Sequence, residues 1–479
     1  MKRRPFLQRA GDALAWTFAP DSVVKRRYDA ARLVSDRNAR FSTFAAETPA
    51  ALNQARSRER YYGESNAYVR AAHRALVTHL VGAGIVAAST HPDAATQAML
   101  ADAWGRFCNE CDSDGLTNLG GLQSALTLDM IRDGEGLALM RNTSRGLRIQ
   151  RLAPDQIDDA QTRDLGGGAF IQSGVEFDSE GQKVAYHLFP ANPANASGMQ
   201  VQSVRVSADD VLHVFEQRGA GQCRGLPWGV AAIKRVGEID QLEDALLVGA
   251  KVGAMLAGFI SDDMGAAPFP FDAETQDGSQ ITAALEPGTL QRLGPGQKVT
   301  FTSPQQAAQG VEFLASQVRA IASAYGVPPQ FVDSDYARTN FSALKSALAV
   351  YAARLDQIVH TILRPMLLDR IWRRWVTTEI LAGRIEALDF ESNPDAWFGA
   401  EWFAPAPPVA DDFKAAQADV LQIQNGLKSR AQAIRERGYA PEALDAERAA
   451  DAQREEALGL IVPTDGEQAD NEESDSNDA

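Results

Sequence analysis

The side chains best suited to specific contacts lie in the segment 327–341, between two helical patterns. They comprise aromatic rings, hydroxyls, amides and one guanidinium group: Gln330, Phe331, Ser334, Tyr336, Arg338, Thr339 and Asn340. Such groups form hydrogen bonds and stack on flat ligands. The segment contains no His or Cys, and no base that could activate a hydroxyl as a nucleophile. Its composition therefore predicts binding and not catalysis.

Sequence signals on both sides place this segment between two helices. Gly326 follows the end of a helical pattern, and Pro328 and Pro329 come directly after it, which is a strong helix stop signal. A second helical pattern begins near Ser342 and continues to Leu381. We expect Pro365 to kink this second helix, because proline lacks a backbone donor and clashes one turn back.

No other part of the sequence shows a catalytic arrangement. The six histidines are scattered, and the HExxH, GxSxG and phosphate-loop motifs are absent. His213 lies in an apolar strand pattern, which predicts a core histidine. Asp333 and Asp335 have no third carboxylate nearby in the sequence, so a metal pair is not expected there. The sequence thus predicts no catalytic residue, no metal and no cofactor.

The three cysteines predict reduced thiols. Cys108 and Cys111 form a CxxC pair, but the pair lies at the end of a helical pattern and lacks the further ligands of a zinc site. With Cys223 they are too few for a disulfide framework. A reducing compartment such as a bacterial cytoplasm is expected.

The charge balance is acidic and uneven. The 479 residues carry 47 Lys and Arg against 63 Asp and Glu, a net charge of −16. An acidic surface disfavours tight, non-specific DNA binding, which depends on cations that displace counterions. It is compatible with a duplex that passes without adhering. Apolar runs approaching ~18 residues are lacking, so a membrane span is not expected. The basic start Met1–Phe6 has no long apolar region after it, and Asp12 lies where that region would need to be, so a signal peptide is not expected either.

The periodicity predicts an α+β chain. Helical patterns fill 50–110, and alternating runs follow that predict an antiparallel sheet with hairpins: 147–152, 171–177, 184–189, 204–206 and 211–215. From Leu226 a long helical pattern has one apolar stripe. Trp372 and Trp375 flank arginines, which would allow base stacking; we favour packing and subunit contact.

Several short motifs, in the same order, resemble those of the portal proteins of tailed bacteriophages, lambda family. They are Ser65–Arg70 with Leu80–Ile85, Arg132–Gly136, Gly174–Asp178 with Val184–Leu188, Val211–Phe215, Arg224–Trp228, Leu285–Thr289, and the loop's Gly326-Val327-Pro328 with Asp335-Tyr336 and Asn340-Phe341-Ser342. Each motif is weak alone, and their common order makes the resemblance specific. It extends from about Asn38 to Gly438.

The resemblance implies a portal fold with an α/β wing, long stem helices, a small β-containing clip, a tunnel loop and a long kinked wing helix. The implied parts are a basic N-terminal arm (1–40), the wing (41–225), a first stem helix (226–258), the clip (259–304), a second stem helix (305–326), the tunnel loop (327–341), the kinked wing helix with its connector (342–400), C-terminal wing or crown helices (401–463) and a disordered acidic tail (464–479). The arm is either a solvated helix or a contact for packaged DNA or an inner-head partner.

The resemblance also implies a function and partners. Twelve copies would form a ring at one capsid vertex, through which double-stranded DNA passes, and the ring would bind the terminase large subunit, the major capsid protein and head-completion proteins. Assembly would occur in the bacterial cytoplasm, and the product would be part of the virion. The seven loop residues named above would face DNA, and acidic clip residues would face the motor: Asp262, Asp263, Asp272, Glu274 and Asp277. The alternatives are a nuclease subunit of the packaging machinery and a non-portal head adaptor.

Overall fold

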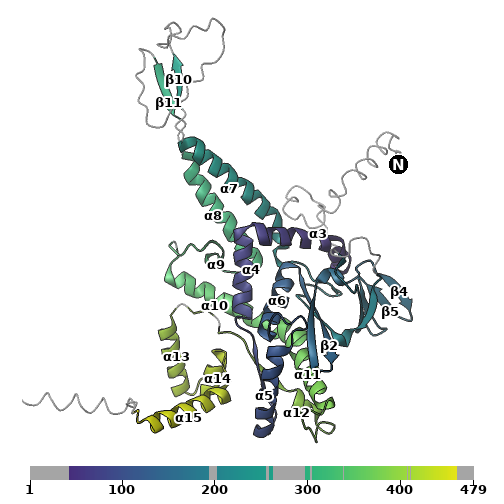
Figure 1. The fold of residues 1–479 in the computed structure, drawn as a ribbon. Coiled ribbons are helices and arrows are strands. Elements are labelled where there is room, and N and C mark those ends of the chain that lie inside the picture. Colours follow the sequence, from purple (N-terminus) through teal and green to yellow (C-terminus); the bar gives the residue numbers. More distant parts are fainter. Residues whose placement is uncertain are drawn as a thin grey trace, which may run out of the picture.

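The computed structural model describes residues 43–193, 202–254, 258–262, 297–301, 305–337, 339–406, 408–409 and 411–460. Most of the predicted clip, all of the predicted arm and all of the predicted acidic tail lie outside these ranges. Figure 1 shows a body of helices and sheets from which one helical hairpin projects. A two-stranded β-hairpin lies at the far end of that projection, and the C-terminal helices lie at the opposite end of the molecule.

Four helices form the N-terminal half of the body: α3 (Phe44–Ser65), α4 (Ala67–Leu80), α5 (Ala94–Glu110) and α6 (Leu119–Arg132). Asn66 caps α4, and its side chain accepts the Tyr68 and Val69 amides at 3.0 Å each. The helical prediction for this region is confirmed. Cys108 and Cys111 are free thiols at the C-terminal end of α5, where burial raises the pKa of each to about 12.

The predicted antiparallel strands form two sheets. One has the order β3-β2-β9, from β2 (Glu135–Thr143), β3 (Gly146–Leu152) and β9 (Val211–Phe215). The other is a meander of β4 (Arg163–Gly166), β5 (Ala169–Gln172), β6 (Val175–Phe177), β7 (Lys183–Leu188) and β8 (Val204–Ser207). The run 171–177, predicted as one strand, is two strands joined by a turn. Short 3-10 helices η2 (Pro154–Gln156) and η4 (Ala208–Asp210) border the strands.

The projecting hairpin consists of α7 (Ile233–Ala254) and α8 (Gln305–Tyr325). The first helix begins later than predicted, because a 3-10 helix, η5 (Trp228–Ala231), precedes it. Close packing of the pair relies on Gly310, where an added Cβ would lie 2.7 Å from Leu246 Cδ2. At its end β10 (Gly258–Asp262) pairs antiparallel with β11 (Gln297–Phe301).

The long C-terminal helix is built from three pieces. They are α10 (Phe341–Ile358), a π-helical segment η6 (Val359–Leu368) and α11 (Asp369–Leu381). Pro365, where a kink was predicted, lies inside this π-helical segment, in which hydrogen bonds to the fifth residue back replace the α-helical ones. At its end the Asp369 amide donates to the Arg364 carbonyl, five residues back.

Tryptophans form the centre of the core beneath that helix. Trp372 and Trp375 are 1% and 0% exposed, and each ring centroid lies 4.9 Å from that of Trp104. Trp402 joins them from β12 (Ala400–Phe403). The packing role favoured for Trp372 and Trp375 is therefore confirmed, since fully buried rings are not available to stack on bases.

The remaining elements follow this helix. α12 (Pro394–Phe398) leads into β12, which pairs antiparallel with β1 (Val86–Ser89). The helices α13 (Asp412–Gln424), α14 (Arg430–Glu436) and α15 (Pro441–Leu458) complete the described chain. None of the helices in the described ranges is long and apolar enough to cross a membrane.

Candidate functional site

The loop between the second helix of the hairpin and the long helix contains a short helix that the sequence did not predict. α8 ends at Tyr325, and Gly326 adopts the left-handed conformation with φ +71°. The short helix α9 (Gln330–Asp333) follows directly, and Ser334 terminates it with φ +58°. The Asn340 side chain then caps α10 by accepting the Ser342 amide at 2.9 Å.

The first part of the loop is docked on the body. The Phe331 ring stacks on His79 of α4 with centroids 5.0 Å apart, and meets Tyr351 of α10 edge-on at 5.6 Å. Val332 beside it is buried. Gln330 Nε2 donates to Thr339 Oγ1 at 3.1 Å and so links the two ends of the loop.

The second part of the loop projects from the body. Ser334, Asp335, Tyr336 and Ala337 are exposed, and Tyr336 keeps 53% of its surface accessible. The Asp335 amide donates to Asp333 Oδ1 at 3.0 Å, and the Ala337 amide to Asp335 Oδ1 at 3.1 Å, which folds the tip as local turns. Arg338 lies outside the described residues. We call Gln330–Asp333 the loop base and 334–338 the loop tip.

The predicted motor-facing acids lie almost entirely outside the described residues. Asp262 ends β10, where it pairs with Gln297. Asp263, Asp272, Glu274 and Asp277 have no described position, so an acidic clip face stays a prediction.

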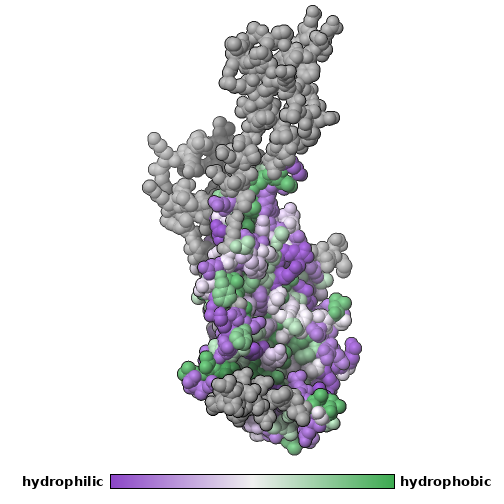
Figure 2. Space-filling model, turned by 90° about the vertical axis from the view of Figure 1, so that its left-hand side faces the viewer, coloured by the Kyte–Doolittle hydropathy of each residue, from purple (hydrophilic) through white to green (hydrophobic). Residues whose placement is uncertain are grey.

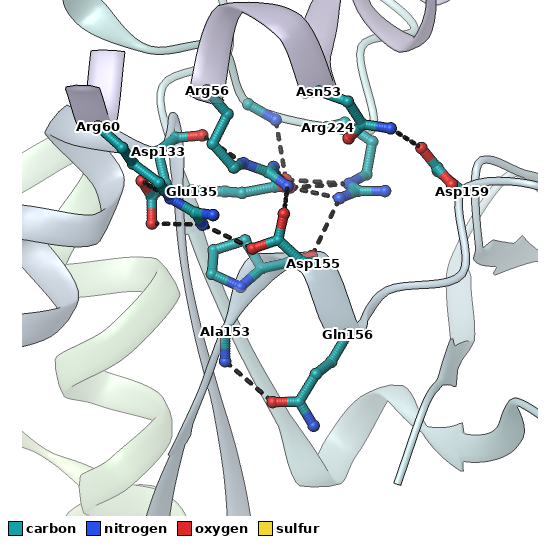
Figure 3. A network of polar contacts seen from close by, with 12 residues as sticks. Asn53, Arg56, Arg60, Asp133, Glu135, Ala153, Asp155, Gln156, Asp159 and Arg224 are labelled. Atoms are coloured by element: carbon teal, nitrogen blue, oxygen red, sulfur yellow. Dashed lines mark hydrogen bonds and ion pairs between the residues drawn. The ribbon is translucent and has the colours of Figure 1, made fainter. Parts of the chain in front are cut away.

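A buried ionic network lies where the hairpin joins the body (Figure 3). Glu135 of β2 is 0% exposed and accepts Arg56 Nη2 at 2.6 Å, Arg224 Nε at 3.0 and 3.1 Å, and the Gly225 amide at 3.1 Å. His213 Nε2 lies 2.9 Å from the same carboxylate. Two of the motifs that resemble the portal family, Arg132–Gly136 and Arg224–Trp228, therefore meet at one buried point. The sequence identified both segments but not their contact.

A second layer of ion pairs surrounds this centre. Asp155 bridges Arg56 at 3.2 Å and Arg60 at 2.6 Å, while Asp133 binds Arg60 at 2.8 Å and Arg132 at 2.9 Å. An open polar hollow of about 390 Å³ is lined by four of these side chains: Arg60, Arg132, Asp133 and Asp155. The guanidinium groups that line the hollow already have carboxylate partners. We therefore interpret the hollow as the surface of a structural network.

Burial and charge set the protonation states at the centre. Burial alone would raise the pKa of Glu135, but Arg224, His213 and Arg56 hold it well below its usual range. Burial lowers the pKa of His213 to about 4. Arg56 and Arg224 already neutralise the Glu135 carboxylate, so a proton on His213 would gain little electrostatic stabilisation from it. His213 is therefore neutral near pH 7. The prediction of a core histidine is confirmed.

A pH dependence of stability follows from the neutral His213. The unfolded chain binds a proton at this histidine below pH ~6.5, whereas the folded chain does so only near pH 4. Stability present above pH ~6.5 should therefore fall by roughly 3 kcal/mol as the pH drops through this window. Urea unfolding at several pH values should show a shallower fall for His213→Gln. His360→Gln, at a 54% exposed side chain, should keep the wild-type slope; equal slopes for all three proteins would contradict the assignment.

A buried triad anchors the base of the second hairpin helix. The Tyr325 hydroxyl donates to Glu59 of α3, and His73 Nε2 of α4 lies 2.9 Å from the same carboxylate oxygen. Gly229 packs so closely that an added Cβ would lie 2.0 Å from the Tyr325 oxygen. The end of α8, and with it the start of the loop, is thus fixed to the body.

The face that carries the loop is not uniformly polar. Figure 2 shows this side of the molecule as a mixture of hydrophilic and apolar patches. A groove of about 870 Å³ lies between the long helix and the C-terminal helices, and Val359, Trp402 and Pro405 are among its lining residues. Within the described ranges, three or more His, Cys, Asp or Glu side chains nowhere come together as metal ligands would.

The comparisons with known proteins identify the family. The family model described as phage portal protein, lambda family, matches residues 31–358, which include the projecting hairpin, the buried network and the loop. The chain belongs to this family. Its C-terminal helices after α10 lie beyond the matched range.

Individual relatives of this portal-family chain are distant. The probable portal protein of Halomonas phage phiHAP-1 is 24% identical over 347 residues, which cover 70% of this chain and 65% of the relative. Portal protein B of Escherichia phage lambda is 23% identical over 355 residues, covering 67% and 66%. The chain thus spans slightly less than two thirds of these relatives.

Solved structures resemble the chain only loosely. A chain from the virion of a native gene transfer agent particle has a TM-score of 0.44 at 14% identity, covering 79% of this chain and 91% of that one. An HK97-family phage portal protein from Corynebacterium diphtheriae has a TM-score of 0.31 at 12% identity, covering 72% and 94%.

Proposed function

We propose that this chain forms the ring-shaped channel at one capsid vertex through which double-stranded DNA is packaged and ejected. The family match across residues 31–358 carries the proposal. The architecture supports it, because a projecting helical hairpin and an exposed loop tip belong to the matched range. By the resemblance we expect twelve subunits.

Unpartnered apolar side chains on the hairpin support a multimeric assembly. Leu247, Val248 and Phe313 are 54%, 57% and 56% exposed on a hairpin that stands away from the body. Identical subunits joined head to tail close into a ring. Neighbouring hairpins would then cover these side chains and form a continuous wall of helices around the duplex.

The proposed partners are those that the resemblance to the portal family implies. We expect the acidic clip to bind the terminase large subunit during packaging and head-completion proteins afterwards, and the wing to contact the major capsid protein. The energy for DNA movement would come from the terminase, so this chain would act as a structural protein without enzymatic activity. Assembly would take place in the bacterial cytoplasm, and the ring would remain in the virion.

Negative-stain imaging of the purified chain tests the proposal directly. Annular particles with a central hole are the expected result. Compact monomers that cleave DNA in a Mg²⁺-dependent manner would overturn it in favour of a nuclease subunit. Particles without a hole and without nuclease activity would favour a non-portal adaptor.

The loop tip is the proposed DNA contact. Replacing Tyr336 and Arg338 together with alanine should leave rings intact and lower the yield of DNA-filled heads about tenfold, because every subunit loses one cation that meets phosphate. Tyr439→Ala with Arg448→Ala changes the same residue types at exposed C-terminal positions and should leave the yield unchanged. A normal yield from the loop variant would remove the tip from the DNA path.

A further inference from the structure

We infer that Phe331 does not contact DNA but, with His79 and Tyr351, positions the loop so that its tip is presented at a fixed place. The inference rests on the proposed function for the identity of what the tip meets. Phe331 was predicted to face DNA; here it takes a positioning role, which it shares with His79 of α4 and Tyr351 of α10.

The contacts of Phe331 show what holds the loop base. One face of its ring stacks on the His79 imidazole, with an angle of 28° between the planes, and Tyr351 approaches its edge. The ring is partly buried, and both its face and its edge are engaged within its own subunit, so its main contacts are not with a duplex. The three rings come from α9, α4 and α10, so they fix the loop to both the body and the long helix.

Hydrogen bonds hold the two supporting rings in turn. His79 Nδ1 lies 3.2 Å from the Tyr351 hydroxyl oxygen, and that hydroxyl donates to the Ala75 carbonyl at 3.4 Å. Tyr351 is 2% exposed, so its ring cannot swing away without opening the core. Burial lowers the pKa of His79, which favours the neutral imidazole that packs on Phe331.

The backbone divides the loop at the point where this docking ends. Ser334, with φ +58°, lies directly after the docked helix, and the exposed tip follows it. The Gln330–Thr339 hydrogen bond closes the loop across the tip. The tip is therefore a short projection on a docked base, and its position depends on whether the base stays docked.

Trypsin cleavage after Arg338 in assembled rings tests the inference, because Arg338 directly follows the exposed Ala337 in the sequence. Cleavage follows the population of the open loop when opening is fast. We expect Phe331→Ala and His79→Ala each to raise the rate about tenfold, which corresponds to ~1.4 kcal/mol of lost docking. The double variant should be no faster than either single one, because both remove the same contact.

Matched variants separate positioning from general damage to the fold. His79→Phe keeps an aromatic ring in place and should restore the wild-type cleavage rate. Tyr336→Ala alters the tip but not the base, and should not reproduce the increase. Unchanged cleavage after Arg338 in both Phe331→Ala and His79→Ala would overturn the inference.

A packaging assay with the same variants distinguishes failure of this inference from failure of the proposed function. Positioning predicts that His79→Ala impairs packaging as much as Phe331→Ala does. Impairment by Phe331→Ala alone would mean direct contact with DNA and would overturn the inference. Faster cleavage with normal packaging would uphold positioning and refute a DNA-contacting role for the loop.

Discussion

Replacing Glu135 with glutamine should destabilise the folded chain by ~3–5 kcal/mol, the range for breaking a buried ion pair by removing one partner. Glu135 is fully buried and neutralises two arginines, Arg56 and Arg224, that are each 1% exposed. Glutamine matches the shape of the side chain but leaves Arg224 without a counter-charge and Arg56 with Asp155 alone, at 3.2 Å. Urea unfolding followed by circular dichroism measures the loss.

A surface pair provides the control for this substitution. Glu379 binds Arg384 through two bonds of 2.7 and 2.8 Å, but the arginine side chain is 40% exposed. Glu379→Gln should therefore cost at most ~1 kcal/mol. Adding Arg224→Met to Glu135→Gln should recover part of the loss, because it removes the guanidinium group that lost its counter-charge. Equal costs for the buried and surface substitutions would show that the network contributes little.

The local parts of the fold could be predicted from the sequence because their signals are local. The helices within 50–110 and the helix stop at Gly326 follow from periodicity and from Gly and Pro positions. The β1–β12 sheet was missed, because a four-residue strand reading Val-Ala-Ala-Ser has little pattern of its own and pairs with residues 400–403. Long-range pairing supplies what the local sequence does not specify.

The candidate site was likewise predictable where its signals are local and not where it depends on contacts between distant segments. Composition picked out the loop residues, but the separation into base and tip depends on His79 and Tyr351, which are 272 residues apart in sequence. The short helix α9 was missed, because the Pro328-Pro329 pair was interpreted only as a stop signal, although proline also suits the first turn of a helix. The buried network likewise needs four separate segments to meet.

Replacing Gly225 with alanine should produce the largest loss of stability, above ~4 kcal/mol, which few single substitutions reach. An added Cβ would lie 1.9 Å from the Gly134 carbonyl oxygen and 2.7 Å from Phe215 Cβ. A flexible side chain could move aside, but the first contact is with backbone. Asp133 and Glu135, on either side of Gly134, are both held by ion pairs, so that backbone cannot retreat without breaking the network.

Gly105→Ala is the matched control, because an added Cβ in the middle of α5 meets nothing within 4 Å. It should stabilise the chain by ~0.5–1 kcal/mol, the usual gain from replacing glycine in a helix. Soluble yield and the urea midpoint measure both variants. A Gly225→Ala protein with a wild-type midpoint would show that the two backbone segments can separate freely. Gly225 leads directly into η5 and α7, so its close contact with Gly134 helps to set the direction of the projecting hairpin and of the proposed channel wall. A wild-type midpoint would therefore also mean that the start of the hairpin is held less firmly than this contact indicates.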